Sequence, residues 1–177
     1  MTYNLFISHS WSYSNQYQGL INLLDKKVEE DEKDNTIKES DKFKYKNYSV
    51  PKDDPVHSAD DDKKLKEAIR KQMQPASGVL ILAGVYATYS KWINIEIELA
   101  KSMDKKIIAI EYWGSERTSQ VVKDNADIVV KWNTNSIVNA IKELSCKYLN
   151  DKLSKSVNDE LSKAISDLSE AIKKYYP

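Results

Sequence analysis

The sequence predicts a doubly wound α/β domain, in which helices cover both faces of a parallel β-sheet. Short apolar segments alternate along the chain with longer segments whose apolar residues repeat at helical spacing. Residues 79–83 and 107–110 are continuous apolar runs, which are typical of strands buried on both faces. The length of 177 residues favours one domain with a sizeable core.

The predicted strands are segments of aromatic and β-branched residues bounded by polar or turn-forming residues. They cover residues 3–8, 45–50, 79–83, 106–111 and 126–130. The polar sequence Ser8-His9-Ser10 ends the first strand, and the turn-forming segment 51–55 follows the second. In a parallel sheet, ligands bind beyond the carboxyl ends of the strands. We therefore expect a site built from loops 8–15, 50–62 and 84–90.

The predicted helices are segments in which apolar residues recur every three or four positions. They cover residues 16–28, 60–73, 88–103, 136–146 and 154–176. Three aspartates at 60–62 suit the first turn of the second helix, because the helix dipole favours negative charge there. The charged segment 29–44 predicts an exposed insertion or a fraying helix end.

The last predicted helix follows a sheet that is already complete. We expect one domain over residues 1–148 and an added amphipathic helix within 149–177. Its apolar residues repeat at helical spacing and are Val157, Leu161, Ala164, Ile165, Leu168, Ala171 and Ile172. Such a stripe must be covered, so the helix packs either on its own domain or on another subunit.

Composition excludes several classes of function. Lys+Arg and Asp+Glu both total 27, so the balance predicts neither nonspecific nucleic-acid binding nor attachment to anionic membranes. Cys146 is the single cysteine, so it predicts no internal disulfide or thiolate metal site, and its helical context is that of a packing residue. No segment has the length of a membrane span, and the N-terminus lacks the pattern of a signal peptide, so a cytoplasmic protein is expected.

A tightly held cofactor is not expected either. The chain has four glycines and no glycine-rich phosphate loop or dinucleotide fingerprint. It also has no cluster of His, Cys and Asp at metal-ligand spacing. A nucleotide would therefore bind as a substrate in an open cleft.

Glu96 is the most informative residue of the third predicted helix. At roughly 100° per residue, Glu96 falls within the apolar arc near Trp92 and Ala100, whereas Glu98 falls on the polar side. An ionised carboxylate in apolar surroundings must be paired, protonated or turned toward a polar cavity. The alternatives are a functional carboxylate near a strand end and a buried salt bridge with Arg70 or a lysine.

Several motifs resemble those of TIR domains. Phe6-Ile7-Ser8-His9-Ser10 resembles their opening motif, and the segments 90–97 and 106–110 resemble their third helix and fourth strand. The segment 45–51, together with Asp53-Asp54-Pro55, is similar to a bacterial TIR-like branch that includes the ThsB proteins of Thoeris antiphage defence. The resemblance covers about residues 3–146.

This resemblance implies a flavodoxin-like fold and cleavage of NAD at the nicotinamide–ribose bond. In Thoeris systems the product is a cyclic ADP-ribose isomer or a related nucleotide, which activates a separate effector. NAD is then a substrate, and no resident cofactor is expected. A homo-oligomer is compatible with the resemblance, because many TIR-like domains are noncatalytic scaffolds that assemble with one another.

The resemblance also implies site residues. Glu96 matches the catalytic glutamate of NAD-cleaving TIR domains, four residues after an aromatic residue. The expected substrate-binding residues are Phe6, Ser8, His9, Ser10, Trp11, Asp53, Tyr86 and Trp92.

Each of these residues also has a structural alternative. The aromatic rings can stack on substrate, or pack in the core or at a subunit contact. The segment Ser8-His9-Ser10 can contact ribose or phosphate, or cap the next helix. Asp53 can line the cleft or form an Asx turn. Participation of His9 or His57 stays open.

Two rival functions accompany the enzymatic hypothesis. The first is a noncatalytic TIR-like adaptor that acts through protein assembly. The second is a phosphotransfer receiver, which shares the fold but needs an aspartate at the end of its third strand. The segment 80–84 has none, so the sequence disfavours a receiver.

Overall fold

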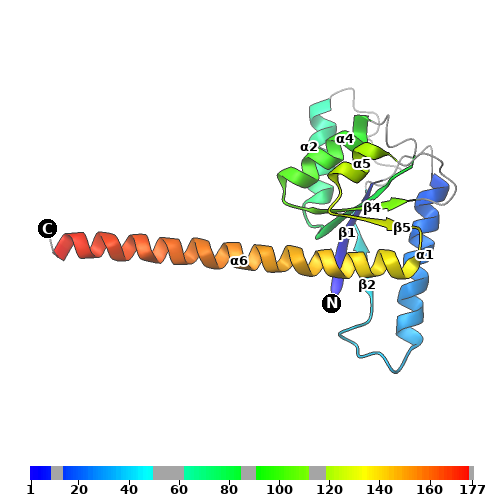
Figure 1. Cartoon of the computed structure of the whole chain (residues 1–177), viewed down its shortest axis with the longest axis horizontal. Coiled ribbons are helices and arrows are strands. Elements are labelled where there is room, and N and C mark those ends of the chain that lie inside the picture. Colours follow the sequence, from blue (N-terminus) through cyan, green and yellow to red (C-terminus); the bar gives the residue numbers. More distant parts are fainter. Residues whose placement is uncertain (9–13, 50–61, 85–90, 112–118, 176–177) are drawn as a thin grey trace.

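The computed structural model describes residues 1–8, 14–49, 62–84, 91–111 and 119–175. Within them, five parallel strands form one sheet in the order β2-β1-β3-β4-β5 (Figure 1). The strands are β1 (Thr2–Ser8), β2 (Lys44–Asn47), β3 (Gly78–Leu82), β4 (Lys106–Glu111) and β5 (Ile128–Lys131). This is the flavodoxin-like, doubly wound order, so the predicted fold class is confirmed.

Helices cover both faces of the sheet (Figure 1). They are α1 (Ser14–Lys33), α2 (Asp62–Met73), α4 (Lys91–Ser102), α5 (Gln120–Asn125) and α6 (Thr134–Tyr175). The core between the sheet and α1 and α6 contains Leu20, Leu24 and Ile141. The core on the opposite face contains side chains of α2, α4 and α5. The sheet is therefore the middle of three layers.

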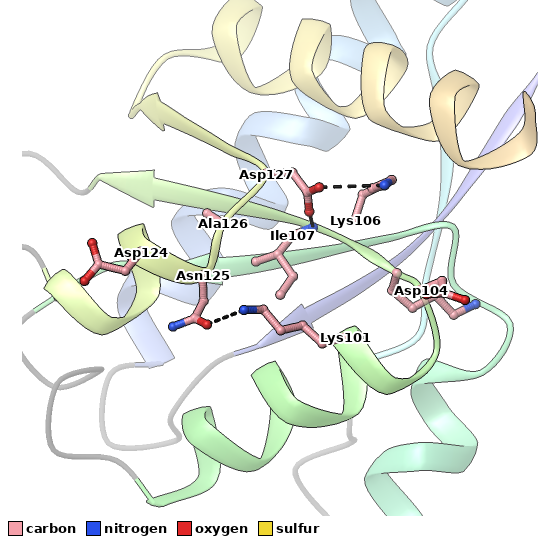
Figure 2. Close-up of a pocket in the computed structure, with 9 residues that line it drawn as sticks. Lys101, Asp104, Lys106, Ile107, Asp124, Asn125, Ala126 and Asp127 are labelled. Atoms are coloured by element: carbon pink, nitrogen blue, oxygen red, sulfur yellow. Dashed lines mark hydrogen bonds and ion pairs between the residues drawn. The ribbon is translucent and has the colours of Figure 1, made fainter. Parts of the chain in front are cut away.

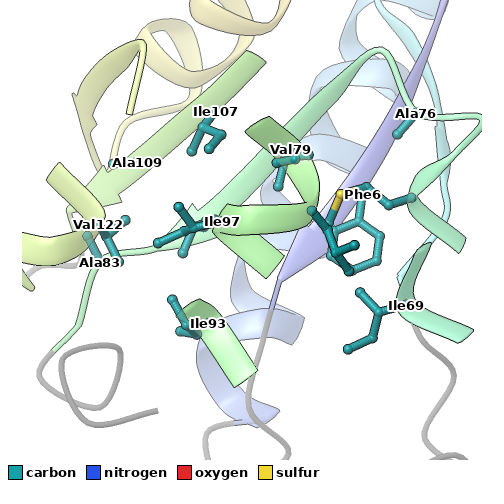
Figure 3. Close-up of a cluster of buried hydrophobic side chains, with 14 of the residues drawn as sticks. Phe6, Ile69, Ala76, Val79, Ala83, Ile93, Ile97, Ile107, Ala109 and Val122 are labelled. Carbon is teal, nitrogen blue, oxygen red and sulfur yellow. The ribbon is translucent and has the colours of Figure 1, made fainter. Parts of the chain in front are cut away.

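Strand β1 contributes to both cores, because successive side chains of a strand point to opposite faces. Leu5 and Ile7 belong to the core under α1 and α6. Phe6 belongs to the other core, where Figure 3 shows it with Val79 and Ile69. Ser8 has the parity of Phe6, so its side chain lies on the face covered by α2 and α4.

The short helix α5 was not predicted. Its six residues are too few for a helical repeat to appear in the sequence. Tertiary contacts stabilise it instead, because Val122 is fully buried and its backbone N–H donates to the capping hydroxyl of Ser119. Helix α1 extends to Lys33, so part of the charged segment 29–44 is regular helix.

The prediction of two separate C-terminal helices was wrong, because α6 is one continuous helix from Thr134 to Tyr175. Residues 147–153 contain neither proline nor glycine, so nothing in the local sequence interrupts the helix. Tyr148 is its last buried residue among those described, and the rest extends away from the domain (Figure 1). Packing of this segment on its own domain, one of the two expected arrangements, is not observed. Cys146 is exposed, contrary to the expected packing role.

No helix in the described ranges is both long and apolar enough to span a membrane.

Lys105 fixes α6 to the amino-terminal edge of the sheet. Its side chain is buried, and its ammonium group donates hydrogen bonds to the carbonyl oxygens of Gln74 and Ala76 at 2.8 and 2.6 Å. A third bond of 3.0 Å reaches the hydroxyl of Tyr148 on α6. A buried charge is tolerated when its donors are satisfied, so Lys105 joins the loop before β3 to α6.

We expect Lys105→Met to lower the free energy of unfolding by about 3 kcal/mol, because buried acceptors lose a charged donor. Urea denaturation of the purified chain measures this change. Lys147→Met, at an exposed position beside Tyr148, is the matched control and should change stability by less than about 0.5 kcal/mol. Equal stability of the two variants would contradict an anchoring role for Lys105.

Candidate active site

The candidate site lies at the carboxyl edge of the sheet, where β1 ends at Ser8 and α4 begins after β3. The expected binding residues His9, Ser10, Trp11, Asp53 and Tyr86 lie outside the described residues, and so does His57. Their roles stay predictions. Of the expected residues, Phe6, Ser8, Trp92 and Glu96 can be placed.

Glu96 lies on the buried side of α4, as the helical spacing predicts. It is 7% exposed and shares this side with Ile93, Ile97 and Ala100. By contrast, the Glu98 side chain is 67% exposed and forms an ion pair of 3.4 Å with Lys66. One turn of helix therefore holds two glutamates in opposite environments.

Ser8 is the hydrogen-bond partner of Glu96. Its hydroxyl donates to Oε2 of the Glu96 carboxylate, and the bond is buried. Both residues reach this position for simple geometric reasons. Ser8 is the last residue of β1 and points toward α4, while Glu96 occupies the side of α4 that faces the sheet. The contact joins residues 88 positions apart in the sequence.

The sequence suggested Ser8 only as a ligand contact or a cap. No local pattern could reveal its contact with Glu96, because the pairing depends on how strand and helix pack.

Burial raises the pKa of Glu96 to about 7, and the hydrogen bond from Ser8 opposes this rise in part. The alternative of a buried salt bridge is not observed, because the ion pairs among the described residues do not include Glu96. Arg70, the suggested partner, is exposed on α2. A carboxyl group that titrates near neutral pH can hold or release a proton, or carry the negative charge that stabilises a developing cation.

Phe6 and Trp92 have different environments. Phe6 is 1% exposed within the core between the sheet and α2, so its described surroundings are those of a packing residue and give no support for ligand contact. Trp92 is 39% exposed at the start of α4, and the Lys91 ammonium group lies 5.8 Å from its ring centroid. Trp92 is exposed and lies near Glu96 in the sequence. Its expected role in stacking on the substrate stays a prediction.

A polar pair also lies at the carboxyl end of β4, and the sequence did not single it out. The Lys123 ammonium group on α5 lies 2.5 Å from the carboxylate of Glu111, the last residue of β4. Within the described ranges, no group of three or more His, Cys, Asp or Glu side chains could hold a metal ion.

A separate cavity of about 380 Å³ lies at the opposite edge of the sheet (Figure 2). Its lining includes Lys106 and Ile107, the first two residues of β4, and Asp127 before β5. Asp127 accepts a hydrogen bond from the Ile107 backbone at 2.8 Å and pairs with Lys106 at 3.8 Å. These polar groups form a hydrogen bond and an ion pair with one another, which link the amino ends of β4 and β5.

The family comparison matches the segment that contains both Ser8 and Glu96. The model described as "Thoeris protein ThsB, TIR-like domain" matches residues 6–117. The chain belongs to this family. The matched ThsB TIR-like region runs from β1 past β4, and α6 lies beyond it. The resemblance found in the sequence is thereby confirmed. No curated protein matches the chain.

One solved structure with a TM-score above 0.5 agrees with the fold. A conserved protein from Enterococcus faecalis V583 is 10% identical, with a TM-score of 0.52, and the match covers 81% of this chain and 99% of that one. The CMP N-glycosidase BcmB from Clostridium botulinum is 12% identical, with a TM-score of 0.43 and coverages of 78% and 97%. A 3-dehydroquinate dehydratase-like protein from Bifidobacterium longum is 8% identical, with a TM-score of 0.45 and coverages of 82% and 95%.

The environment of Glu96 predicts a specific pH dependence of stability. A carboxyl group whose pKa is 4.5 in the unfolded chain and about 7 in the folded one favours folding while protonated. This advantage is complete below about pH 4.5 and is lost as the pH rises through 7. The wild type should therefore lose up to about 3 kcal/mol of stability relative to Glu96→Gln between about pH 5 and 8.

Urea denaturation of both proteins at the two pH values measures this difference. Glu98→Gln, on the exposed side of the same helix, should follow the wild type. If Glu96→Gln also follows the wild type at both pH values, the raised pKa is refuted.

Proposed function

We propose that this ThsB-family protein cleaves NAD at the nicotinamide–ribose bond and forms a cyclic ADP-ribose-type nucleotide that activates a separate effector in antiphage defence. The observation that carries the proposal is the buried Glu96 carboxylate, held by Ser8 at the carboxyl edge of β1. Membership of the ThsB TIR-like family supports the same reading, because Glu96 lies inside the matched region.

The first step breaks the bond between ribose C1′ and the nicotinamide nitrogen. The bonding electrons leave with the nitrogen, which becomes neutral, and positive charge develops on the ribose as an oxocarbenium ion. The Glu96 carboxylate stabilises this charge and orients the ribose hydroxyls. Its apolar surroundings strengthen that interaction, because little water is present to screen it.

The second step attaches a nucleophile to C1′. A ribose hydroxyl or an adenine nitrogen of the same molecule attacks, loses its proton where it carries one, and closes the ring. Attack by water instead gives linear ADP-ribose. The cyclic product therefore requires a folded substrate and exclusion of water, for which the exposed indole of Trp92 offers a stacking surface.

Ser8 acts in this proposal as a positioning residue. Its hydroxyl donates to one oxygen of Glu96, which fixes the carboxylate and lowers its pKa toward neutrality. In this proposal the second carboxylate oxygen contacts the ribose, and Ser8 acts through Glu96 and not through direct contact with ribose or phosphate.

The alternative is a noncatalytic adaptor. Its support is the row of exposed apolar side chains on α6, which indicates assembly without requiring chemistry. The two readings differ in two observable results. An adaptor assembles without consuming NAD, and substitution of Glu96 leaves its antiphage activity intact.

Mass spectrometry of small molecules from cells expressing the chain during phage infection tests the proposal. The wild type should deplete NAD and accumulate a cyclic ADP-ribose-type product, whereas Glu96→Gln should reduce both by at least about a hundredfold, because an amide carries no charge to stabilise the ribose cation. Glu98→Gln is the matched control and should retain wild-type levels. Full NAD consumption by Glu96→Gln would refute the assigned mechanism.

The pH profile of nicotinamide release provides a second test. If the ionised carboxylate is required, kcat/KM rises about tenfold per pH unit below 7 and levels off above it. Ser8→Ala removes the bond that favours the ionised form, so the midpoint should move upward by about one pH unit. A midpoint that stays in place in Ser8→Ala would contradict the positioning role.

A further inference from the structure

Helix α6 carries two apolar stripes, one after the other. The first packs on the domain and includes Ile137, Ile141, Leu144 and Tyr148, all of which are buried. The second lies beyond the domain, and its large side chains are more than half exposed. These are Leu153, Val157, Leu161, Ile165, Leu168 and Ile172. We call this second set the distal stripe.

The two stripes lie on different sides of the helix. At roughly 100° per residue, the centre of the distal stripe is rotated by roughly 145° from the centre of the domain-facing stripe. The distal stripe is therefore not a continuation of the surface that binds the domain. The part of α6 that carries it extends away from the domain (Figure 1).

The charge of the distal segment narrows the choice of partner. Residues 149–175 carry five acidic residues and five lysines. The acidic residues are Asp151, Asp159, Glu160, Asp167 and Glu170, and the lysines are Lys152, Lys155, Lys163, Lys173 and Lys174. An interfacial membrane helix is typically rich in basic residues, and a nucleic-acid surface also requires excess positive charge. A neutral helix instead meets a second copy of itself without net repulsion.

We propose that the distal stripe pairs with the distal stripe of a second copy of this chain, forming a two-helix interface outside the domains. The stripe from Leu153 to Ile172 extends over roughly 30 Å of helix, or several layers of apolar side chains. Because each stripe is rotated away from the domain-facing side of its helix, the two domains lie on the outer sides of the helix pair. Two-fold pairing of identical surfaces buries both apolar stripes at once.

The helix pair leaves the candidate active site free. Helix α6 leaves the domain at the amino-terminal edge of the sheet, where Lys105 contacts Tyr148 and Lys106 pairs with Asp151 at 3.5 Å. Ser8 and Glu96 lie at the carboxyl edge. Pairing through the distal stripe and access to Glu96 are therefore spatially separate.

Sedimentation of the purified full chain over a wide concentration range tests this proposal. The wild type should show twice the 20.4 kDa mass of one chain. The double variant Leu161→Glu/Leu168→Glu should sediment as a monomer, because each dimer would bury four carboxylates in its interface. The control Ser162→Glu/Ser166→Glu adds the same charge on the other side of the helix and should remain dimeric.

Circular dichroism distinguishes loss of pairing from loss of folding, and Leu161→Ala/Leu168→Ala provides a milder variant that should weaken dimerisation at least tenfold. A wild type that stays monomeric at all concentrations would overturn the proposal, whether α6 then folds onto its own domain or remains extended for a different partner. Dimers that persist in the Leu161→Glu/Leu168→Glu variant would overturn it as well.

Discussion

Strand β1 packs against both helical layers, because it lies between β2 and β3 and alternates its side chains between the two faces of the sheet. Leu5 and Ile7 fill one core, and Phe6 fills the other. The same alternation directs Ser8 toward α4 at the point where the strand ends. A change of one residue in the register of β1 would therefore disturb both cores and move the Ser8 hydroxyl away from Glu96.

The Ser8–Glu96 pair shows how the domain tolerates a carboxyl group in an apolar layer. Burial disfavours the charged form, and one hydroxyl donor compensates for only part of that effect. A residue selected for stability alone would be apolar here, like Ile93 and Ile97 beside it. The local conflict between burial and charge is typical of positions retained for function.

The two edges of the sheet have different roles. Around Lys105 and Lys106 at the amino-terminal edge, the polar contacts are between protein groups, which fixes α6 to the domain. At the carboxyl edge, Ser8 and Glu96 form a buried polar pair without a described counter-charge. This division allows the helix to extend for many turns beyond the domain without altering the geometry around Glu96.

Much of the fold was predictable from the sequence, because strand and helix periodicities are local properties. The apolar runs identified β3 and β4, and the helical spacing placed Glu96 on the buried side of α4 and Glu98 on the exposed side. Helix α5 was missed because six residues do not complete a repeat, and α6 was divided because its two stripes differ in direction. Only the tertiary structure joined Ser8 to Glu96 and buried Phe6, since these contacts depend on how distant segments pack. The sequence by itself determined which side of each element is apolar, and the tertiary structure decided which of those sides meet.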